Sequence, residues 1–222
     1  MKVVVFTLGC KVNECESDAL ISGLLDKGYE VSDKLEYADL YIVNTCAVTA
    51  EAEKKSRQTS ARIKKLNPNA RVIYTGCATQ KDCKPFLQKD NASLVTGVFS
   101  KGKILEMLDS TGAVISEPNT VYEDLPTVKT RRERVFIKVQ DGCDNFCSYC
   151  IIPYLRGRSR SRNPQSVLEE INALSPKEIV INGINLSAFD YNGVTLTGLM
   201  QMLKALPCRI RLGSLEVGVF TD

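Results

Sequence analysis

The sequence predicts an α/β fold with parallel sheets, and two observations carry this prediction. Short runs of β-branched, aliphatic and aromatic residues alternate along the chain with longer segments of helical spacing, which is typical of strands joined by crossover helices. Charged residues make up 25% and hydrophobic residues 44% of the 222-residue chain. This ordinary globular mixture excludes a disordered, collagen-like or coiled-coil chain.

The first alternation of strands and helices occupies the amino-terminal half. Three apolar runs predict strands, and each is followed within three residues by a cysteine: 3–8, 40–43 and 71–75. Two segments with helical spacing predict helices between them: 14–27 and 50–66. A shorter unit follows, with a weak strand at 94–95 and a helix at 100–109. This order of elements predicts one parallel sheet covered by helices.

A second alternation begins after a change of character at residues 111–130, which hold two prolines, mixed charge and few aliphatic pairs. We therefore divide the chain into a first domain at 1–115, a linker at 116–130 and a second domain at 131–222. The second domain is predicted to contain strands at 135–139, 178–182 and 209–213 and helices at 164–174 and 196–205. Three strands and two helices leave sheet edges uncovered, so we expect the sequence to be part of a longer chain.

Composition also limits the chemistry. No apolar run approaches the roughly 20 residues of a membrane span, so we expect a cytoplasmic chain without a membrane partner. Histidine is absent, which excludes a Cys2His2 zinc finger, a Ser-His-Asp triad and a Cys-His nucleophile pair. Nine cysteines in a reducing compartment indicate metal or redox chemistry rather than disulfides. A bound metal would therefore be held mainly by thiolates.

Positive charge is concentrated in one segment. Residues 129–162 contain nine Lys or Arg against three Asp or Glu, although the net charge of the whole chain is only +3. A basic segment in an otherwise mildly acidic chain indicates an anionic partner. A solvated basic loop explains the same pattern equally well from charge alone.

One group of cysteines lies close together in the sequence. Cys143, Cys147 and Cys150 form a C-x3-C-x2-C pattern in a loop that follows the predicted strand at 135–139. Three thiolates in eight residues can ligate three irons of an iron–sulfur cube and leave the fourth iron open to an exogenous ligand. The alternatives are a zinc site with a remote fourth cysteine and simple buried thiols.

A second group is scattered in the sequence but follows a rule. Cys10, Cys46 and Cys77 each come one to three residues after a predicted strand. The carboxyl ends of parallel strands share one edge of the sheet, where ligands commonly bind, so these thiols can meet and hold a second cluster. The alternative is three unrelated small residues at strand ends. The other cysteines lack this placement, and we interpret them as ordinary small residues: Cys15, Cys83 and Cys208.

The motifs around both groups resemble a known enzyme family. The loop 142–150, with an aromatic residue before its last cysteine, resembles the cluster motif of radical S-adenosylmethionine enzymes. The continuation at 151–162 resembles the methylthiotransferase branch of that superfamily. The segments around the scattered cysteines also resemble the amino-terminal cluster domain of this branch: 9–13, 44–46 and 75–77.

The resemblance covers essentially the whole chain and implies a fold and a reaction. It implies an amino-terminal parallel-sheet α/β domain followed by the first half of a radical S-adenosylmethionine partial (βα) barrel. Family members continue for roughly the same length again, with the remaining barrel strands and an RNA-gripping TRAM domain. The implied cofactors are two 4Fe-4S clusters, held by the two cysteine trios, and S-adenosylmethionine. The implied partners are the anticodon stem-loop of tRNA and an electron donor such as flavodoxin or ferredoxin.

Three segments favour one substrate within the family. The stretches 10–13, 47–50 and 55–58 resemble enzymes that insert sulfur and a methyl group at C2 of N6-threonylcarbamoyladenosine beside the anticodon. The alternatives are the same chemistry on isopentenyladenosine in tRNA or on a ribosomal-protein aspartate, or a metal-binding fragment without catalysis. No side chain is predicted to be catalytic, because an adenine C2–H is not acidic enough for a side-chain base.

The resemblance also implies cofactor contacts. Tyr149 is expected to lie against the adenine of S-adenosylmethionine, and Gly183 and Asn185 are expected to contact the cofactor from the end of the next strand. Glu216 is expected to reach its ribose or amino group. Loop packing explains Tyr149 equally well, and strand-end Gly, Asn and Glu are also plain turn residues.

Four arginines alternate within the basic segment: Arg156, Arg158, Arg160 and Arg162. We expect these four side chains to project to two faces of the segment. We expect one face to meet RNA phosphates and the other to meet the cofactor carboxylate or backbone carbonyls. The alternative is a solvated arginine loop.

Overall fold

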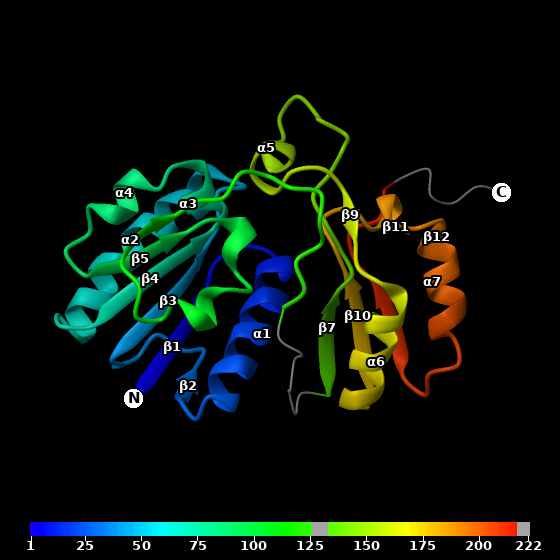
Figure 1. The fold of residues 1–222 in the computed structure, drawn as a ribbon, viewed down its shortest axis with the longest axis horizontal. Helices are drawn as coiled ribbons and strands as arrows, with labels where there is room; N and C mark the ends of the chain where they lie inside the picture. Colours follow the sequence, from blue (N-terminus) through cyan, green and yellow to red (C-terminus); the bar gives the residue numbers. More distant parts are fainter. Residues whose placement is uncertain (126–132, 217–222) are drawn as a thin grey trace.

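The computed structural model describes residues 1–125 and 133–216, which form two sheet-based units that lie side by side (Figure 1). Within the first range, six strands form one parallel sheet in the order β2-β1-β3-β4-β5-β6. Their bounds are Lys2–Thr7 for β1, Glu30–Ser32 for β2, Leu40–Thr45 for β3, Arg71–Gly76 for β4, Ala92–Thr96 for β5 and Gly112–Val114 for β6.

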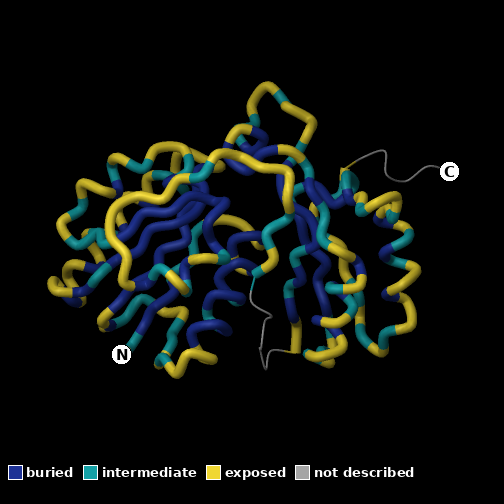
Figure 2. Tube along the Cα trace, viewed as in Figure 1, coloured by how far each residue is buried: buried dark blue, intermediate teal, exposed yellow. Residues whose placement is uncertain are grey.

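Alternate side chains of these strands enter two separate cores, as the two-residue period of a strand requires. On one face, Val3 and Val5 pack with Leu20 and Leu24 of helix α1 (Lys11–Asp26). On the other face, Val4 packs with residues of three helices: α2 (Ala50–Leu66), α3 (Cys77–Lys81) and α4 (Lys84–Leu87). The central strands are therefore buried on both faces (Figure 2).

The second unit is built on a smaller parallel sheet in the order β13-β10-β7. Its strands are β7 (Arg134–Lys138), β10 (Glu178–Asn182) and β13 (Arg209–Leu212). Helices α6 (Pro164–Leu174) and α7 (Leu196–Leu203) contribute Val167, Ile171 and Leu199 to its core. Helix α1 lies between the two units and contacts β7, so one helix belongs to both packing interfaces (Figure 1).

Short elements surround the second sheet. Strands β8 (Gln140–Asp141) and β9 (Arg160–Ser161) form an antiparallel pair, and so do β11 (Asp190–Tyr191) and β12 (Val194–Thr195). Helix α5 (Ile152–Arg156) follows the loop of Cys143 to Cys150, and η3 (Leu186–Ala188) is a 3-10 turn. Leu155 of α5 joins the core of the first unit, which brings this loop beside the first sheet.

The predicted α/β class and the parallel sheets are confirmed, whereas the partial barrel and the domain boundaries stay predictions. The helix expected at 100–109 is wrong. Two 3-10 segments occupy this stretch instead, η1 (Val98–Ser100) and η2 (Ile104–Glu106). Successive amides here donate three residues back rather than four, as from Glu106 N to Lys103 O at 3.0 Å.

The stretch 111–130 is also more structured than its composition suggested. Residues Gly112–Val114 form β6 and pair with β5, so this part belongs to the first sheet. Of the linker placed at 116–130, residues 126–130 lie outside the described residues. Tyr122 lies in the described part and donates its hydroxyl to Lys138 O at 2.9 Å. No helix in the described ranges is both long and apolar enough to cross a membrane.

Candidate functional site

The scattered cysteines lie at the carboxyl ends of three neighbouring strands. Cys10 comes shortly after β1, Cys46 directly follows β3, and Cys77 directly follows β4. The register pairs Thr7 with Asn44 and Thr45 with Gly76, so the three chains leave the sheet at nearly the same level. Adjacent strands are about 4.8 Å apart, and Cys46 and Cys77 occupy neighbouring strand ends. We call Cys10, Cys46 and Cys77 the edge trio.

Two glycines let the chain turn at this edge. Gly9 has φ +109°, and a Cβ on it would lie 2.8 Å from the Cys46 sulfur. Gly76 has φ +110°, and a Cβ on it would lie 2.5 Å from Thr45 O. Any side chain at either position would therefore collide with the neighbouring strand. The glycine before Cys10 and the glycine before Cys77 are what allow the backbone to approach Cys46 so closely.

Buried amides and hydroxyls fix the backbone of the edge. Asn13 Nδ2 donates to Leu8 O at 2.7 Å and to Thr45 O at 3.0 Å, which ties the start of α1 to the ends of β1 and β3. Ser56 Oγ of α2 accepts from Cys46 N and donates to Cys46 O, both at 3.1 Å. Cys46 is therefore held on both sides of its peptide unit.

The members of the edge trio act on one another electrostatically. Burial raises the pKa of the Cys46 thiol, and the neighbouring Cys77 and Cys10 raise that pKa further. The positive charge of Arg156 opposes this rise. Cys46 and Cys77 are buried while Cys10 is exposed. The trio thus has one thiol facing outward and two inside the protein.

The second group of cysteines lies in one loop, which we call the cysteine loop (142–150). Cys143, Cys147 and Cys150 are half-buried. Cys143 N donates to Gly157 O at 3.1 Å and Cys150 N donates to Cys147 O at 2.9 Å, so backbone bonds shape the loop. Tyr149 is 90% exposed, and the negative charge of Cys147 raises the pKa of its hydroxyl.

The structure places the other predicted contact residues around this loop. Gly183 directly follows β10, and a Cβ there would lie 2.8 Å from Gln140 Oε1. Asn185 is buried in a turn, where its side chain accepts from Ser187 N at 3.1 Å. Glu216 accepts a hydrogen bond from Asn145 Nδ2 of the cysteine loop. The roles of Tyr149, Gly183, Asn185 and Glu216 as cofactor contacts stay predictions.

A cavity of about 330 Å³ lies between Cys10 of the edge trio and the carboxyl end of β10. The first unit contributes Cys10, Lys11, Val12 and Val48 to its wall. The second unit contributes Ile152, Asn182, Gly183, Ile184 and Ser214. Its volume lies in the range of small-molecule sites, and its wall is mainly apolar.

The donor set at both places fits an iron–sulfur cluster. Thiolates are the ligands such clusters take, and each place offers three cysteines, on adjacent strand ends in one case and in one loop in the other. Within residues 1–125 and 133–216, no three Cys, Asp or Glu side chains gather closely enough to hold a single metal ion. A four-iron cube separates its ligands more widely than a single ion does.

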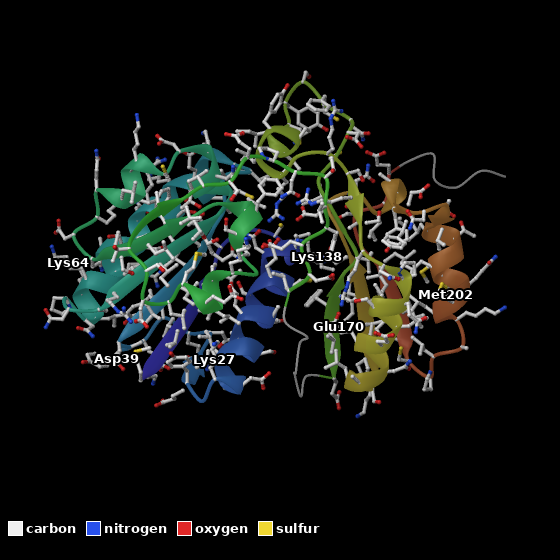
Figure 3. All side chains as sticks on the ribbon, viewed as in Figure 1. Lys27, Asp39, Lys64, Lys138, Glu170 and Met202 are labelled. Atoms are coloured by element: carbon white, nitrogen blue, oxygen red, sulfur yellow. The ribbon has the colours of Figure 1, made fainter. Side chains whose placement is uncertain are left out.

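A buried ion network lies between the two sheets and was not predicted. It comprises two carboxylates and four cations: Glu16, Asp141, Lys101, Lys138, Arg156 and Arg160. Lys138 and Arg156 each contact both carboxylates at 2.7 to 3.0 Å. Figure 3 shows Lys138 in the region between helix α1 and the second sheet. The network joins α1 of the first unit to β7, β8 and α5 of the second.

The network sets the protonation of its carboxylates. Burial alone would raise the pKa of Glu16, but the positive charges of Arg156, Lys101 and Lys138 outweigh it and hold the pKa well below its usual value. Asp141 behaves in the same way, with burial opposed by Arg156, Lys138 and Arg160. Both carboxylates are therefore ionised at neutral pH.

Most partners of the four alternating arginines are carboxylates, which the sequence did not predict. Arg156 and Arg160 are buried and donate to Asp141, and Arg160 also donates to Arg158 O at 3.3 Å. Arg158 is exposed and lies 3.4 Å from Asp144. Arg162 pairs with Glu170. The expected contact with backbone carbonyls is present, but carboxylates are the main acceptors.

Comparison with known proteins supports the resemblance. Residues 2–97 match the model of the family described as "Uncharacterized protein family UPF0004". The chain is 35% identical to the threonylcarbamoyladenosine tRNA methylthiotransferase MtaB of Bacillus subtilis over 100% of this chain and 53% of the relative. It is 38% identical to the MtaB of Chlamydia pneumoniae over 97% of this chain and 51% of the relative.

A relative with another name also matches. The tRNA-2-methylthio-N(6)-dimethylallyladenosine synthase of Christiangramia forsetii is 32% identical over 86% of this chain and 43% of the relative. The chain spans about half the length of the curated relatives it matches.

The close approach at Gly76 predicts a large effect of a single methyl group. Gly76→Ala should lower the free energy of unfolding by about 3 kcal/mol, from an unfavourable φ and a collision with Thr45. Gly28→Ala is the matched control, because Gly28 also has a positive φ (+80°) but no atom lies within 4 Å of the added Cβ. Gly28→Ala should lower the free energy of unfolding by about 1 kcal/mol. Urea unfolding measures both, and equal costs would contradict the close approach.

The ion network predicts a loss of stability in acid. The pKa of Glu16 is lower in the folded than in the unfolded protein, so its contribution is full above about pH 5 and is lost as the pH falls below about 4. Glu16→Gln should therefore make the acid loss shallower by up to about 1.4 kcal/mol per pH unit. Urea unfolding at pH 3, 4, 5 and 7 tests this. Parallel curves for both proteins would show that Glu16 does not have a lowered pKa.

Proposed function

The chain belongs to the MtaB-like methylthiotransferase family, and from this premise we propose that it takes part in adding sulfur and a methyl group to C2 of N6-threonylcarbamoyladenosine in tRNA. The observation that supports this most is the edge trio on three adjacent parallel strands, with Cys10 in the wall of a cavity shared with the second sheet. Relatives named for threonylcarbamoyladenosine cover 97 to 100% of this chain, and relatives named for dimethylallyladenosine cover 86 to 93% of it.

Two sets of residues would hold the cofactors. The edge trio would hold one 4Fe-4S cluster, and Cys143, Cys147 and Cys150 would hold another, each with one iron left without a protein ligand. The bound clusters and S-adenosylmethionine supply radical chemistry, which the reaction needs because an adenine C2–H is not acidic. An electron donor such as flavodoxin or ferredoxin would complete this set of partners.

The chain's own residues bind, orient and exclude water. The cavity wall from Val12, Val48 and Ile152 is apolar and suits the flat face of a base. Burial of Cys46 and Cys77 keeps water from the inner side of the edge trio. Glu216 holds Asn145 and thereby orients the cysteine loop, and exposed Tyr149 offers a stacking face at the end of that loop.

Cysteine substitutions test which residues bind iron. After anaerobic reconstitution with ferrous iron and sulfide, we expect about eight irons and eight sulfides per chain. Replacing the edge trio by alanine should halve both contents, and so should replacing Cys143, Cys147 and Cys150. Cys83→Ala and Cys208→Ala are matched controls, because these half-buried thiols lie outside both groups and should leave the contents unchanged. Zinc as the bound metal, or full iron in either triple variant, would reject the assignment.

Nucleoside analysis tests the substrate. tRNA from cells that lack the gene should contain N6-threonylcarbamoyladenosine without its 2-methylthio derivative, as measured by mass spectrometry. Loss of the 2-methylthio derivative of the isopentenyl nucleoside instead would transfer the proposal to the second substrate. Unchanged tRNA nucleosides would contradict a tRNA substrate and leave the ribosomal-protein aspartate.

A further inference from the structure

The ion network between the sheets contains more positive than negative charge. Each carboxylate serves three cations: Glu16 contacts Lys101, Lys138 and Arg156, and Asp141 contacts Lys138, Arg156 and Arg160. Lys138 is the most accessible member, with 10% of its side chain exposed. Four cations therefore share two carboxylates in a place that water barely reaches.

A third carboxylate nearby does not balance the surplus. Glu123 is half-buried, accepts a hydrogen bond from Gly102 N at 2.9 Å and lies within electrostatic range of Lys101 and Lys138. Burial raises its pKa, which favours its neutral form. Even when Glu123 is counted as fully ionised, four cations and three carboxylates leave the network with a net positive charge. An unbalanced buried charge is strongly unfavourable, so a balancing anion is needed close by.

Arg156 connects the positively charged network to the edge trio. Its Nη2 donates to Asn13 Oδ1 at 2.7 Å, and Asn13 in turn donates to the carbonyl of Thr45, the residue before Cys46. Arg156 acts electrostatically on both Cys46 and Cys77. Its Nε and the Nε of Arg160 are buried and have no hydrogen-bond acceptor among the described residues. The surplus charge therefore lies within electrostatic range of the two buried thiols and is linked through Asn13 to the residue before Cys46.

We propose that the buried network is the counter-charge of an anionic iron–sulfide group held by the edge trio, with Arg156 as the residue that couples them. The proposal rests on the proposed function, because the clusters are what that function assigns to the trio. Thiolate ligands and sulfide make such a group negative. Arg156 then stabilises the anion and also links it to Asp141, two residues before Cys143 of the other group.

The protein without iron provides the first test. Glu16→Gln should lower the melting temperature by about 10 °C, because Asn44 Oδ1 is then the one hydrogen-bond acceptor that Lys101 retains among the described residues. Arg156→Gln removes a surplus cation and should lower the melting temperature by less than half as much. Equal losses for the two variants would mean that the cations are not in surplus, and the proposal would be overturned.

The reduction potential of the edge group provides the second test. A background with Cys143, Cys147 and Cys150 replaced by alanine isolates it, and a redox titration followed by electron paramagnetic resonance measures its midpoint. Arg156→Gln should shift the midpoint to a more negative potential, because a positive charge that favours the added electron is lost. Arg156→Lys keeps the charge and should keep the midpoint near that of the background.

Arg158→Gln is the matched control, because this arginine is two residues away but exposed and paired with Asp144. It should leave the midpoint unchanged. An unchanged midpoint in Arg156→Gln, or an equal shift in Arg158→Gln, would overturn the proposal. Failure of the background protein to bind iron would instead reject the proposed function, and the comparison of melting temperatures would still decide whether the network carries surplus charge.

Discussion

The contact of two cations with two buried carboxylates holds the two units together. Lys138 and Arg156 each contact Glu16 from the first unit and Asp141 from the second. Ion pairs out of water add little net stability, but removing one partner leaves a charge that nothing else can satisfy. The network is therefore specific rather than strongly stabilising. It permits one arrangement of α1 against β7 and β8, and so one placement of the edge trio relative to the cysteine loop.

Within the first unit, the parallel strand register places the three cysteines of the edge trio at one level. Three strands that start at different depths would deliver their following residues to different levels. Here Thr7 pairs with Asn44 and Thr45 pairs with Gly76, which puts the following residues on one rim. Gly9 and Gly76 then let the backbone turn where any side chain would collide. The trio depends on strand register and on two missing side chains as much as on the cysteines themselves.

The sequence predicted the features that local pattern controls. Strand periodicity found β1, β3, β4, β7 and β10, and the rule that cysteines follow strands found the shared edge, because both depend on neighbours within a few residues. It missed β6, a short strand that pairs with β5, and the two 3-10 segments between these strands. It also missed the ion network. Arg156 and Glu16 are 140 residues apart, and nothing local marks either as the other's partner.

The carboxylate partners of the alternating arginines were also not predictable from local pattern, because they lie on other parts of the chain. Side chains two residues apart share one face of an extended strand, so alternation by itself did not justify the two faces that were expected. Burial does separate Arg156 and Arg160 from exposed Arg158, because α5 ends at Arg156 and the chain turns at Gly157 before β9. The sequence cannot tell whether the inner face, formed by Arg156 and Arg160, meets a ligand or a carboxylate, because Glu16 and Asp141 reach that place only after both units have folded. The numbers of cations and carboxylates in the ion network answer part of this question. Two carboxylates do not balance four buried cations, so the inner face serves internal ion pairs and still retains positive charge beside Cys46 and Cys77.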